Sequence, residues 1–549
     1  MNKIRIGLLI IIISMSTSQN YSQVSQEWVA RYSGPVNVDI PYSIAVDDSG
    51  NVYVTGQSAG SGSNYDYVTI KYNSSGIQQW FQRYNGTGNS TDNAFSVVVD
   101  DFHNVYVTGR SWGIGSAFDY ATIKYSMSGD LQWVQRYDGD VNDNDEAKAI
   151  AVDHSGNVYV TGYSWGIYSD YATIKYSSSG VQQWVRRYNN PPDGSDLAYS
   201  ITIDNFGNVY VAGGSYLQGT GYDYAMVKYN SSGTEQWIRR YNGPANADDI
   251  SISVKVDFSG NVYETGYSYG SGSGIDYATV KYNSGGVEQW VQRYNGPPGN
   301  LSDYARAIVI DSSGNVYVTG ESSGSGSSYD YATIKYNTSG VQQWVQRYNA
   351  PENSSDKACC ITVDELENVY VTGTTLPGSG TDENYTSIKY NPSGNQLWVE
   401  VYNGPGSSSS FDITHGIAID KMGNVYVTGE SDGVGTSRDY ATIKYSQTII
   451  GINPNSHNLP GKFLLEQNYP NPFNPSTFIR YTLIENDFVT LKVYDVLGNE
   501  IATLVNEEQS RGNYNYQLSA VNFQLSSGIY YYRLESGSFS EVRKMILLK

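Results

Sequence analysis

The sequence predicts an all-β protein in which an eight-bladed β-propeller of four-stranded blades is followed by a small immunoglobulin-like β-sandwich. A tryptophan that opens a short strand recurs eight times at intervals of 51 to 54 residues, and a constant period of this length indicates a repeat architecture. The 549 residues include 52 tyrosines and 57 glycines, a mixture that favours strands separated by turns over helices. The recurring tryptophans are Trp28, Trp80, Trp133, Trp184, Trp237, Trp290, Trp344 and Trp398.

Residues 1–23 read as a secretory signal peptide. Lys3 and Arg5 precede an apolar run from Ile6 to Ile13, and a polar segment follows it. The run is too short to cross a bilayer as a helix, so no transmembrane segment is expected. The net charge of −20 disfavours nucleic acid and anionic membrane surfaces as partners. We therefore expect an exported protein.

Each repeat supplies four strands, which we call a to d. In the first repeat, strand a is Ser43 to Asp47, strand b is Asn51 to Thr55, strand c is Tyr67 to Tyr72 and strand d is Gln79 to Tyr84. Strand a ends at an aspartate in every copy, with bulky residues on one face and mostly small residues on the other. This pattern suits a sheet packed between two similar sheets.

The repeats occupy residues 24–446, and four-stranded units repeated radially form a propeller. The first strand d, around Trp28, precedes any strand a, whereas the last repeat has no strand d after it. We expect the N-terminal strand to complete the last blade, with residues 26–32 beside residues 439–445. This arrangement closes the ring and removes an exposed sheet edge.

Two motifs in the third repeat carry a family resemblance. Asp153 to Gly162, followed by Asp170 to Tyr176, resembles the SBBP-type β-propeller repeats of exported bacterial proteins. The resemblance covers nearly all of residues 24–446 and implies a scaffold on or outside the cell surface, with no defined reaction. Such repeats are usually linked with seven-bladed rings, from which a count of eight departs.

The repeat pattern is lost in residues 447–462, which read as a linker rich in glycine, proline and asparagine. Short alternating strands follow in residues 463–549, as expected for a small sandwich. The expected strands lie near 479–483, 489–493, 528–534 and 542–547.

Several short motifs occur in this C-terminal module. Their residues include Asn471, Pro472, Phe473, Asn474, Pro475, Gly498, Gly528, Tyr530, Lys544 and Lys549. Together, and in this order, the motifs resemble the type A C-terminal sorting domain of the type 9 secretion system. The resemblance implies export across the outer membrane with the secretion machinery as partner, followed by release or by attachment to the cell surface. An ordinary sandwich appended for binding is the alternative.

The b–c loops and d–a connections are expected at one end of the ring, and they vary between repeats, whereas the a–b and c–d turns at the other end are short and nearly constant. Binding residues tend to lie on variable loops held by a rigid frame. Trp112 and Trp165 lie in b–c loops, and Tyr216 and Tyr269 occupy the corresponding places in the next two repeats. These aromatic rings could stack on sugars or anchor a protein partner. The alternative is that each ring packs on a glycine of its own loop.

One d–a connection is strongly acidic, with Asp138, Asp140, Asp143, Asp145 and Glu146. Such oxygen-rich clusters suit Ca²⁺, but the spacing fits no calcium-loop motif. No cofactor is therefore expected, and solvated charge is preferred over a calcium site.

The sequence shows no catalytic constellation. The adjacent pair Cys359 and Cys360 is similar to a feature of pyrroloquinoline quinone dehydrogenases, but nothing else matches a quinone site, and Cys360 occupies a position where the other repeats carry small residues. The four histidines are scattered and no nucleophile motif accompanies them. Catalysis by a carboxylate pair stays open because the chain has 54 acidic residues.

The leading hypothesis is therefore a secreted or cell-surface scaffold that binds a glycan or protein through its variable-loop face, without catalysis. An extracellular propeller enzyme, either polysaccharide-active or quinone-dependent, is the first alternative. A purely structural or adhesive surface protein is the second.

Overall fold

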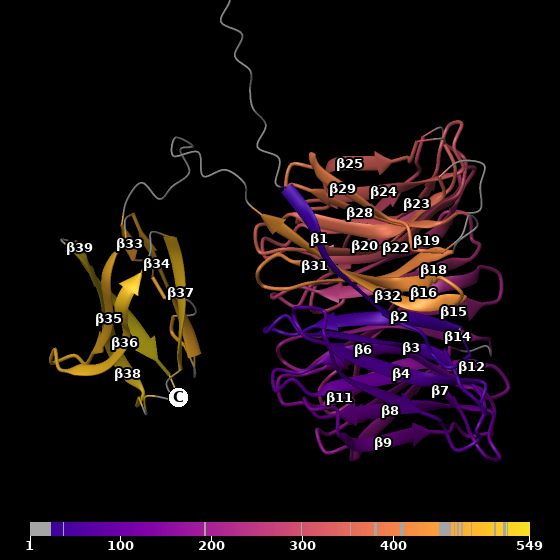
Figure 1. Cartoon of the computed structure of the whole chain (residues 1–549), viewed down its shortest axis with the longest axis horizontal. Coiled ribbons are helices and arrows are strands. Elements are labelled where there is room, and N and C mark those ends of the chain that lie inside the picture. Colours follow the sequence, from indigo (N-terminus) through magenta and orange to yellow (C-terminus); the bar gives the residue numbers. More distant parts are fainter. Residues whose placement is uncertain are drawn as a thin grey trace, which may run out of the picture. The chain divides into compact units, whose positions relative to one another are not determined.

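The computed structural model describes residues 23–448 except 37, 191–193, 298, 352, 378–381 and 407–410, and residues 463–548 except 466, 469–470, 474–475, 485, 510–511, 520–522, 524 and 538. The signal segment, most of the linker and the motif residues Asn474, Pro475 and Lys549 lie outside this part. The described residues form strands and turns without a helix, which confirms the all-β class (Figure 1). No helical segment long and apolar enough to span a membrane occurs among them. The chain divides into two compact units, Met1–Ile450 and Gly451–Lys549.

The first unit contains eight four-stranded antiparallel sheets, the blades. The first blade has the order β2 (Asp39–Val46), β3 (Val52–Ala59), β4 (Tyr65–Tyr72) and β5 (Gln78–Tyr84), which are its strands a to d. Strand a starts earlier than its pattern predicts and ends before the aspartate, because that carboxylate begins the following turn.

The next six blades repeat this order. They are β6 (Asp92–Val99), β7 (Val105–Trp112), β8 (Phe118–Tyr125) and β9 (Leu131–Tyr137); β10 (Asp145–Val152), β11 (Val158–Trp165), β12 (Ser169–Tyr176) and β13 (Gln182–Tyr188); β14 (Asp196–Ile203), β15 (Val209–Leu217), β16 (Gly221–Tyr229) and β17 (Glu235–Tyr241); β18 (Asp249–Val256), β19 (Val262–Gly270), β20 (Gly274–Tyr282) and β21 (Glu288–Tyr294); β22 (Asp303–Ile310), β23 (Val316–Ser323), β24 (Tyr329–Tyr336) and β25 (Gln342–Tyr348); and β26 (Asp356–Val363), β27 (Val369–Thr375), β28 (Asn384–Tyr390) and β29 (Gln396–Tyr402).

The eighth blade is assembled from both ends of the propeller sequence. Its strands a to c are β30 (Asp412–Ile419), β31 (Val425–Asp432) and β32 (Arg438–Thr448), and its fourth strand is β1 (Gln23–Tyr32). β1 runs antiparallel to β32, with Gln26 opposite Tyr445 and Tyr32 opposite Tyr440. The predicted joint between the N-terminal strand and the last repeat is therefore confirmed.

The a strands form the inner wall of a closed ring. Each a strand contacts the a strands of both neighbouring blades, and β30 contacts β2. Side chains of β3 are buried throughout, whereas most side chains of β2 are only half-buried. Because protein surrounds the a strands, this partial exposure shows that they line a central channel that water reaches. A cavity of about 200 Å³ opens among the turns that end β14, β18 and β22.

Repeated side chains join each blade to the next. Trp80 donates from Nε1 to the Met127 carbonyl at 3.1 Å, and its ring lies against Gly129 of the same c–d turn. The hydroxyl of Tyr67 donates to the Ala121 carbonyl, and Lys71 donates to the Met127 carbonyl. Buried aromatic and β-branched residues of neighbouring blades share one core at each interface. The constant tyrosines, tryptophans and lysines are thus structural, as their pattern predicts.

The second unit is a sandwich of two sheets with its own core. One sheet has the order β33 (Leu464–Leu465), β34 (Ser476–Leu483) and β37 (Gly512–Ser519). The other has the order β36 (Glu500–Gln509), β35 (Asp487–Tyr494), β38 (Gly528–Ser536) and β39 (Phe539–Leu547). β33, β36 and β37 are not predicted from the sequence. β36 buries only one hydrophobic side chain and so lacks clear alternation.

Candidate ligand-binding face

Different side-chain contacts fix the turns and loops at the two ends of the ring. At one end, the a–b turn is set by Asp47, whose Oδ1 accepts the backbone N–H groups of Ser49 and Asn51. The Tyr53 hydroxyl donates to Oδ2 of the same carboxylate at 2.8 Å. The same turn recurs in every blade, so this end is nearly constant and its polar residues serve turn geometry.

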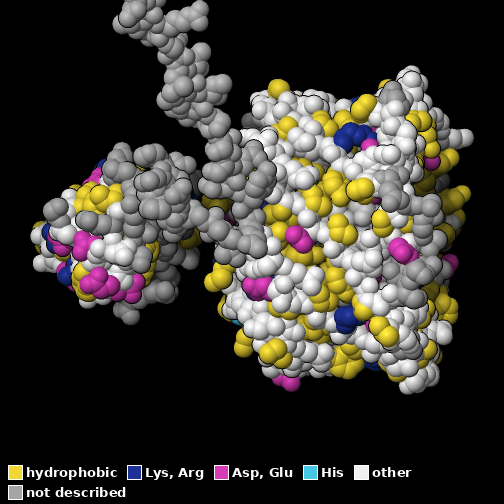
Figure 2. All heavy atoms as spheres, turned by 45° about the horizontal axis from the view of Figure 1, so that its top comes forward, with side chains coloured by type: hydrophobic (Ala, Val, Ile, Leu, Met, Phe, Trp, Pro, Cys, Tyr) yellow, Lys and Arg dark blue, Asp and Glu magenta, His cyan; other side chains and the backbone are white. Residues whose placement is uncertain are grey.

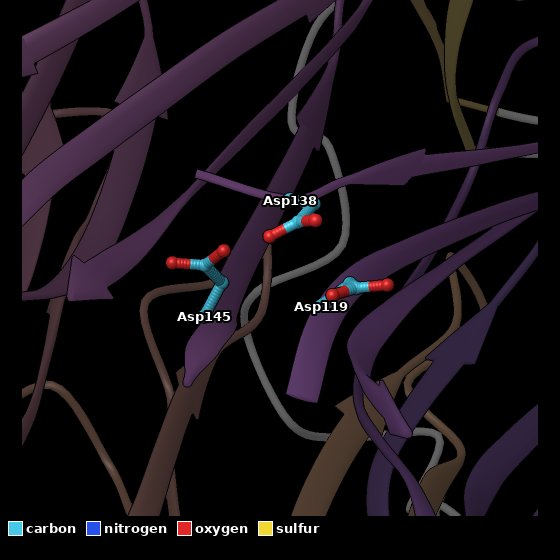
Figure 3. A group of neighbouring side chains, drawn as sticks. All are labelled: Asp119, Asp138 and Asp145. Carbon is cyan, nitrogen blue, oxygen red and sulfur yellow. The ribbon is translucent and has the colours of Figure 1, made fainter. Parts of the chain in front are cut away.

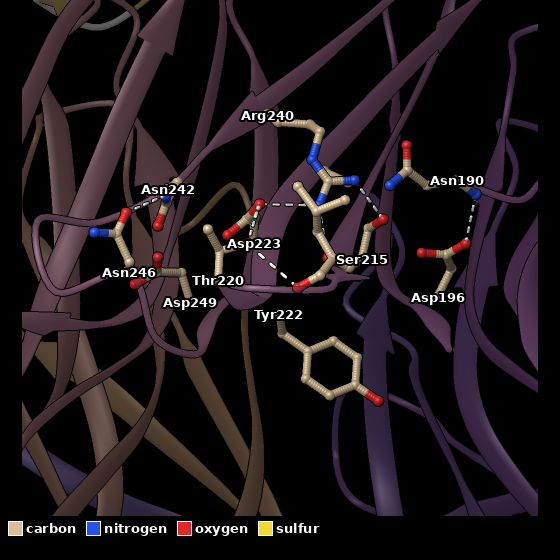
Figure 4. A network of polar contacts seen from close by, with 12 residues as sticks. Asn190, Asp196, Ser215, Thr220, Tyr222, Asp223, Arg240, Asn242, Asn246 and Asp249 are labelled. Carbon is tan, nitrogen blue, oxygen red and sulfur yellow. Dashed lines mark hydrogen bonds and ion pairs between the residues drawn. The ribbon is translucent and has the colours of Figure 1, made fainter. Parts of the chain in front are cut away.

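At the other end, an arginine on strand d fixes the b–c loop. Arg240 donates to the Ser215 hydroxyl at 2.7 Å, to the Ser215 carbonyl at 2.8 Å and to Asp223 at 3.0 Å (Figure 4). The charge-assisted contacts hold the start of strand c against the end of strand b. Seven blades share this network through Arg31, Arg83, Arg136, Arg187, Arg240, Arg293 and Arg347.

A second carboxylate fixes the d–a connection at the same end. Asp249, the first residue of β18, is fully buried and accepts the Gly243 backbone N–H at 2.5 Å. An equivalent aspartate opens every a strand. Burial raises the pKa of these carboxyls, to about 6 at Asp145, Asp196, Asp249 and Asp356. The variable loops are therefore held on a rigid polar frame.

The four aromatic residues singled out in the sequence occupy one equivalent position on four consecutive blades. Trp112, Trp165, Tyr216 and Tyr269 each lie at or near the end of strand b, and between 36% and 39% of each residue is exposed. The backbone N–H of Trp112 donates to Thr91, and Trp165 and Tyr216 make the matching contact with their own d–a connections. The other four blades carry Ala59, Ser323, Leu376 and Asp432 at this position.

Residues around each ring leave part of it open. The Trp112 ring packs edge-on against Phe118 at 5.0 Å between ring centroids, and the Tyr216 ring packs similarly against Tyr222 at 5.6 Å. These two rings also contact Gly88 and Gly194, which belong to d–a connections. The alternative that a ring packs on a glycine of its own loop stays a prediction, and the rings stay half-exposed on the variable-loop face.

A ring of side chains inside the channel was not found from the sequence. Every a strand contains a β-bulge at its middle residue, for instance Tyr42 between the paired residues Pro41 and Ser43. Neighbouring bulge residues meet around the channel, with Tyr42 between Phe95 and His415. The signal was available, because the fifth residue before the strand-a aspartate varies between repeats that are otherwise alike. The bulge residues are Tyr42, Phe95, Lys148, Tyr199, Ile252, Arg306, Cys359 and His415.

Lysine and arginine side chains that do not recur in every blade lie along this channel. Glu146 bridges Arg110 and Lys148 at 2.6 and 2.7 Å, and the Lys148 ammonium lies 4.5 Å from the Phe95 ring centroid. Lys255 stands where the other blades carry alanine, valine or threonine, and its side chain is exposed. The channel therefore joins aromatic and cationic groups in a protein whose net charge is −20.

The described residues also include two cysteines and three histidines. The thiols of Cys359 and Cys360 lie 2.9 Å apart, because the bulge lets consecutive side chains approach each other. Hydrogen bonding to Cys360, together with burial, raises the pKa of the Cys359 thiol. His415 lies 3.5 Å from Glu430, and His103 and His154 lie beside aspartates of neighbouring a–b turns.

Three carboxylates meet at the interface between the second and third blades. One oxygen each of Asp119, Asp138 and Asp145 lies within 4.8 Å of the others (Figure 3). Two of the five acidic residues noted in the sequence, Asp138 and Asp145, belong to this group, and Glu146 points instead to Arg110. Asp119 on strand c completes it, a residue that sequence spacing alone does not bring to the cluster.

In the second unit, the motif residues hold the C-terminal strand in place. Asn471 accepts the Ile546 backbone N–H at 2.8 Å and donates to the Lys544 carbonyl. Phe473 is buried and pairs with Leu547 of β39. Gly498 has a φ of 86°, and its turn repeats the carboxylate geometry of the a–b turns through Asp495.

Two family models match the chain. A model described as a beta-propeller repeat matches residues 27–62, 79–115, 132–169, 183–216, 289–326 and 406–435. A model described as a secretion system C-terminal sorting domain matches residues 467–548. No curated protein matches the chain.

Solved structures similar to the chain share little sequence with it. A catalytically inactive virginiamycin B lyase from Staphylococcus aureus is 13% identical, with 64% of this chain and 96% of that one covered and a TM-score of 0.36. PorZ, a surface component of the type-IX secretion system of Porphyromonas gingivalis, is 13% identical over 94% and 75%, with a TM-score of 0.32. A protein of unknown function from Dyadobacter fermentans is 9% identical over 77% and 99%, with a TM-score of 0.37. All three scores are below 0.5, so none of these likenesses bears on function.

Proposed function

Because this chain is a secreted β-propeller protein that carries a type 9 secretion sorting domain and is exported through it, we propose that it is a non-catalytic binding protein that holds a glycan on its variable-loop face. The sorting domain accounts for delivery to the cell surface or the medium, and the propeller accounts for a rigid platform.

The observation that carries the proposal is the row of half-exposed aromatic rings on four consecutive blades. Trp112, Trp165, Tyr216 and Tyr269 share one position, whereas the other four blades carry other residue types there. A ring braced from one side and open on the other presents a flat apolar face against which a sugar ring can stack. An arc of such faces suits an extended chain of sugar units.

A protein ligand fits this surface less well. Hot spots for proteins cluster in a well-packed central patch, and such patches are contiguous and apolar. Here each aromatic ring stands on its own blade, held by polar loop contacts such as those of Arg240. The channel adds cations and aromatic rings beside the arc, as Arg110 and Lys148 show. Both features favour a polar polymer.

A glycan array probed with the mature protein tests the proposal. The double variant Trp112→Ala/Trp165→Ala is expected to bind its glycan at least about tenfold more weakly, because each stacking contact contributes on the order of 1 kcal/mol. The control is Phe102→Ala/Phe206→Ala, which removes two exposed aromatic residues from the a–b turns at the opposite end of the ring. Its binding should equal that of the wild type.

Unchanged glycan binding in the Trp112→Ala/Trp165→Ala variant would reject this face as the binding site. A pull-down that captured a protein, with no glycan bound on the array, would replace the glycan with a protein ligand. Release of sugars from a polysaccharide, or a quinone absorbance in the purified protein, would contradict the absence of catalysis.

A further inference from the structure

We propose that the interface between the second and third blades is a Ca²⁺ site formed by Asp119, Asp138 and Asp145. These residues come from β8, from the connection that follows β9, and from β10. The site would join two blades through their loops, and it stands independently of the proposed glycan binding.

The geometry of the three carboxylates suits one bound ion. Their nearest oxygens lie within 4.8 Å of one another, and Asp138 and Asp145 turn their carboxylates toward each other in Figure 3. Oxygens that bind one Ca²⁺ at about 2.3–2.6 Å can be no more than about 5 Å apart. The donor set contains only oxygen, which favours a hard cation over zinc or copper. Ca²⁺ accepts flexible coordination by carboxylate oxygens, whereas Mg²⁺ demands near-ideal octahedral geometry.

One buried oxygen of the site has no hydrogen-bond partner among the described residues, and the equivalent oxygens of Asp66, Asp223, Asp276, Asp330 and Asp439 in other blades share this property. Asp119 is 4% exposed, and its Oδ2 accepts both hydrogen bonds from Arg136. Its Oδ1 is buried and accepts no hydrogen bond. A buried carboxylate oxygen without a donor costs about 1–3 kcal/mol or more, and a cation removes that cost. Asp138 is exposed, so the site is open to solvent for ion entry.

The charge balance also points to a divalent cation. Three carboxylates and the Arg136 guanidinium leave a net charge of −2 at the interface. Like charges held close together in this way require a counter-ion or a proton. A Ca²⁺ ion would neutralise the net charge completely.

Other blade interfaces provide a built-in comparison. The interface between the fourth and fifth blades has the equivalent aspartates Asp223 and Asp249, but Asn242 replaces the third carboxylate (Figure 4). The Asn242 side chain donates to the Asn246 side chain, so its contact lies within its own d–a connection. An asparagine stands at this position in six interfaces, so the second interface is distinguished by its third negative charge. The asparagines are Asn85, Asn189, Asn242, Asn295, Asn349 and Asn403.

A bound ion would order the loops that carry two of the exposed aromatic residues. Asp145 accepts the backbone N–H of Trp165 at 3.2 Å. Arg136, which holds Asp119, also donates to the carbonyl of Ser111, the residue before Trp112. Calcium would therefore stiffen both b–c loops as well as the blade interface.

Isothermal titration of the EDTA-treated mature protein with CaCl₂ tests the proposal. The wild type should bind one ion with a Kd of about 10⁻⁴ to 10⁻³ M or tighter, as extracellular calcium modules do, and its unfolding temperature should rise with Ca²⁺. Asp138→Asn installs the residue that six other interfaces use, so it should fold normally and bind at least about tenfold more weakly. Asn242→Asp should create a second site.

The proposal would be overturned if the wild type showed neither calcium-dependent heat nor a shift in unfolding temperature up to about 1 mM Ca²⁺. So would an Asp138→Asn protein that binds as tightly as the wild type. If Asn242→Asp gained no second ion, the third carboxylate would not be what makes the site. A wild type that bound Mg²⁺ as well as Ca²⁺ would contradict the assignment of calcium.

Discussion

Side chains that the repeat holds constant make the same contact in blade after blade. Each c–d turn glycine from Gly76 to Gly394 leaves no room for a Cβ, because the tryptophan of the preceding strand d lies against it. The exception follows from the way the ring closes. Trp398 faces the eighth blade, whose fourth strand comes from the N-terminus instead of following a c–d turn, and its Nε1 has no hydrogen-bond partner among the described residues.

Glu264 breaks the repeat inside the core. It lies on β19 at a position where the other seven blades carry valine, and its side chain is fully buried. Burial raises the pKa of Glu264 from 4.5 to about 8, and the neighbouring Ser251 and Tyr282 hydroxyls offset only part of this. No contact explains why a glutamate stands here.

Replacing this residue should stabilise the propeller. Because the folded-state pKa lies above the unfolded one, the folded protein keeps a proton that the unfolded chain releases, so stability falls as the pH rises from 4.5 through about 8. At pH 7 this costs about 3 kcal/mol, at about 1.4 kcal/mol per pH unit. Glu264→Val should therefore raise the free energy of unfolding by about that amount at pH 7 and by much less at pH 4.5.

Denaturant unfolding at both pH values measures the difference between wild type and variant. Glu264→Gln is the control, because it removes the titrating group but keeps a polar side chain, and its difference from Glu264→Val should not depend on pH. A Glu264→Val protein equal to or less stable than the wild type at pH 7 would contradict this account of the buried carboxyl.

Among the elements, strands b and c follow closely from their recurring sequences and turn residues, whereas strand a does not. Its side chains face two neighbouring blades and the channel, and a bulge interrupts its period of two in every blade. The bulge residue, for instance Phe95 or Lys148, therefore does not fall on either of the two strand faces that an alternating pattern predicts. For the same reason, the sequence reveals the aromatic arc on strand b but not the ring inside the channel.

The joint between β1 and β32 is the element on which closure of the ring depends. Ser25 and Ser446 lie opposite each other in this pair, and their hydroxyl oxygens are 3.0 Å apart. Ser25→Cys/Ser446→Cys, in a Cys359→Ser/Cys360→Ser background, should therefore form a disulfide under mild oxidation. Because the crosslink spans 421 residues, it should stabilise the unit by about 6 kcal/mol in the chain-entropy model.

Thiol titration and unfolding with and without reductant measure this crosslink. Ser25→Cys/Ser61→Cys serves as the control, since Ser61 lies in a b–c loop and should stay reduced. Two free thiols in the Ser25→Cys/Ser446→Cys protein, with unchanged stability, would mean that the N-terminal strand does not pair with the last repeat.

At the scale of the molecule, many charged side chains of the propeller are paired with one another. Few charged side chains lie on the propeller face in view in Figure 2, and arginines and aspartates form part-buried ion pairs at the blade edges. Periodicity in the sequence predicts the repeats and the closure, because both depend on local pattern. The carboxylate cluster of Asp119, Asp138 and Asp145 could not be predicted in full, because blade-to-blade packing brings Asp119 to the other two.

The two units should also behave as separate folding units. The hydrophobic core of the sandwich contains only residues of the second unit, from Leu465 to Leu547, and the propeller cores contain only residues of the first. Removing residues 451–549 should therefore leave the unfolding temperature of the propeller within about 2 °C of its value in the full chain. The same truncation should abolish export, because the sorting domain directs it.

Calorimetry of the full-length and truncated proteins checks the unfolding temperature. Cell fractionation of an expressing strain that has the type 9 machinery checks export. Phe473→Ala in the full chain offers a milder variant. Loss of this buried ring from its place beside Leu547 should destabilise only the sandwich, by about 3 kcal/mol or more. A propeller that unfolded earlier after truncation would show that it depends on the sandwich, and a truncated chain found outside the cell would show that export does not require the C-terminal unit.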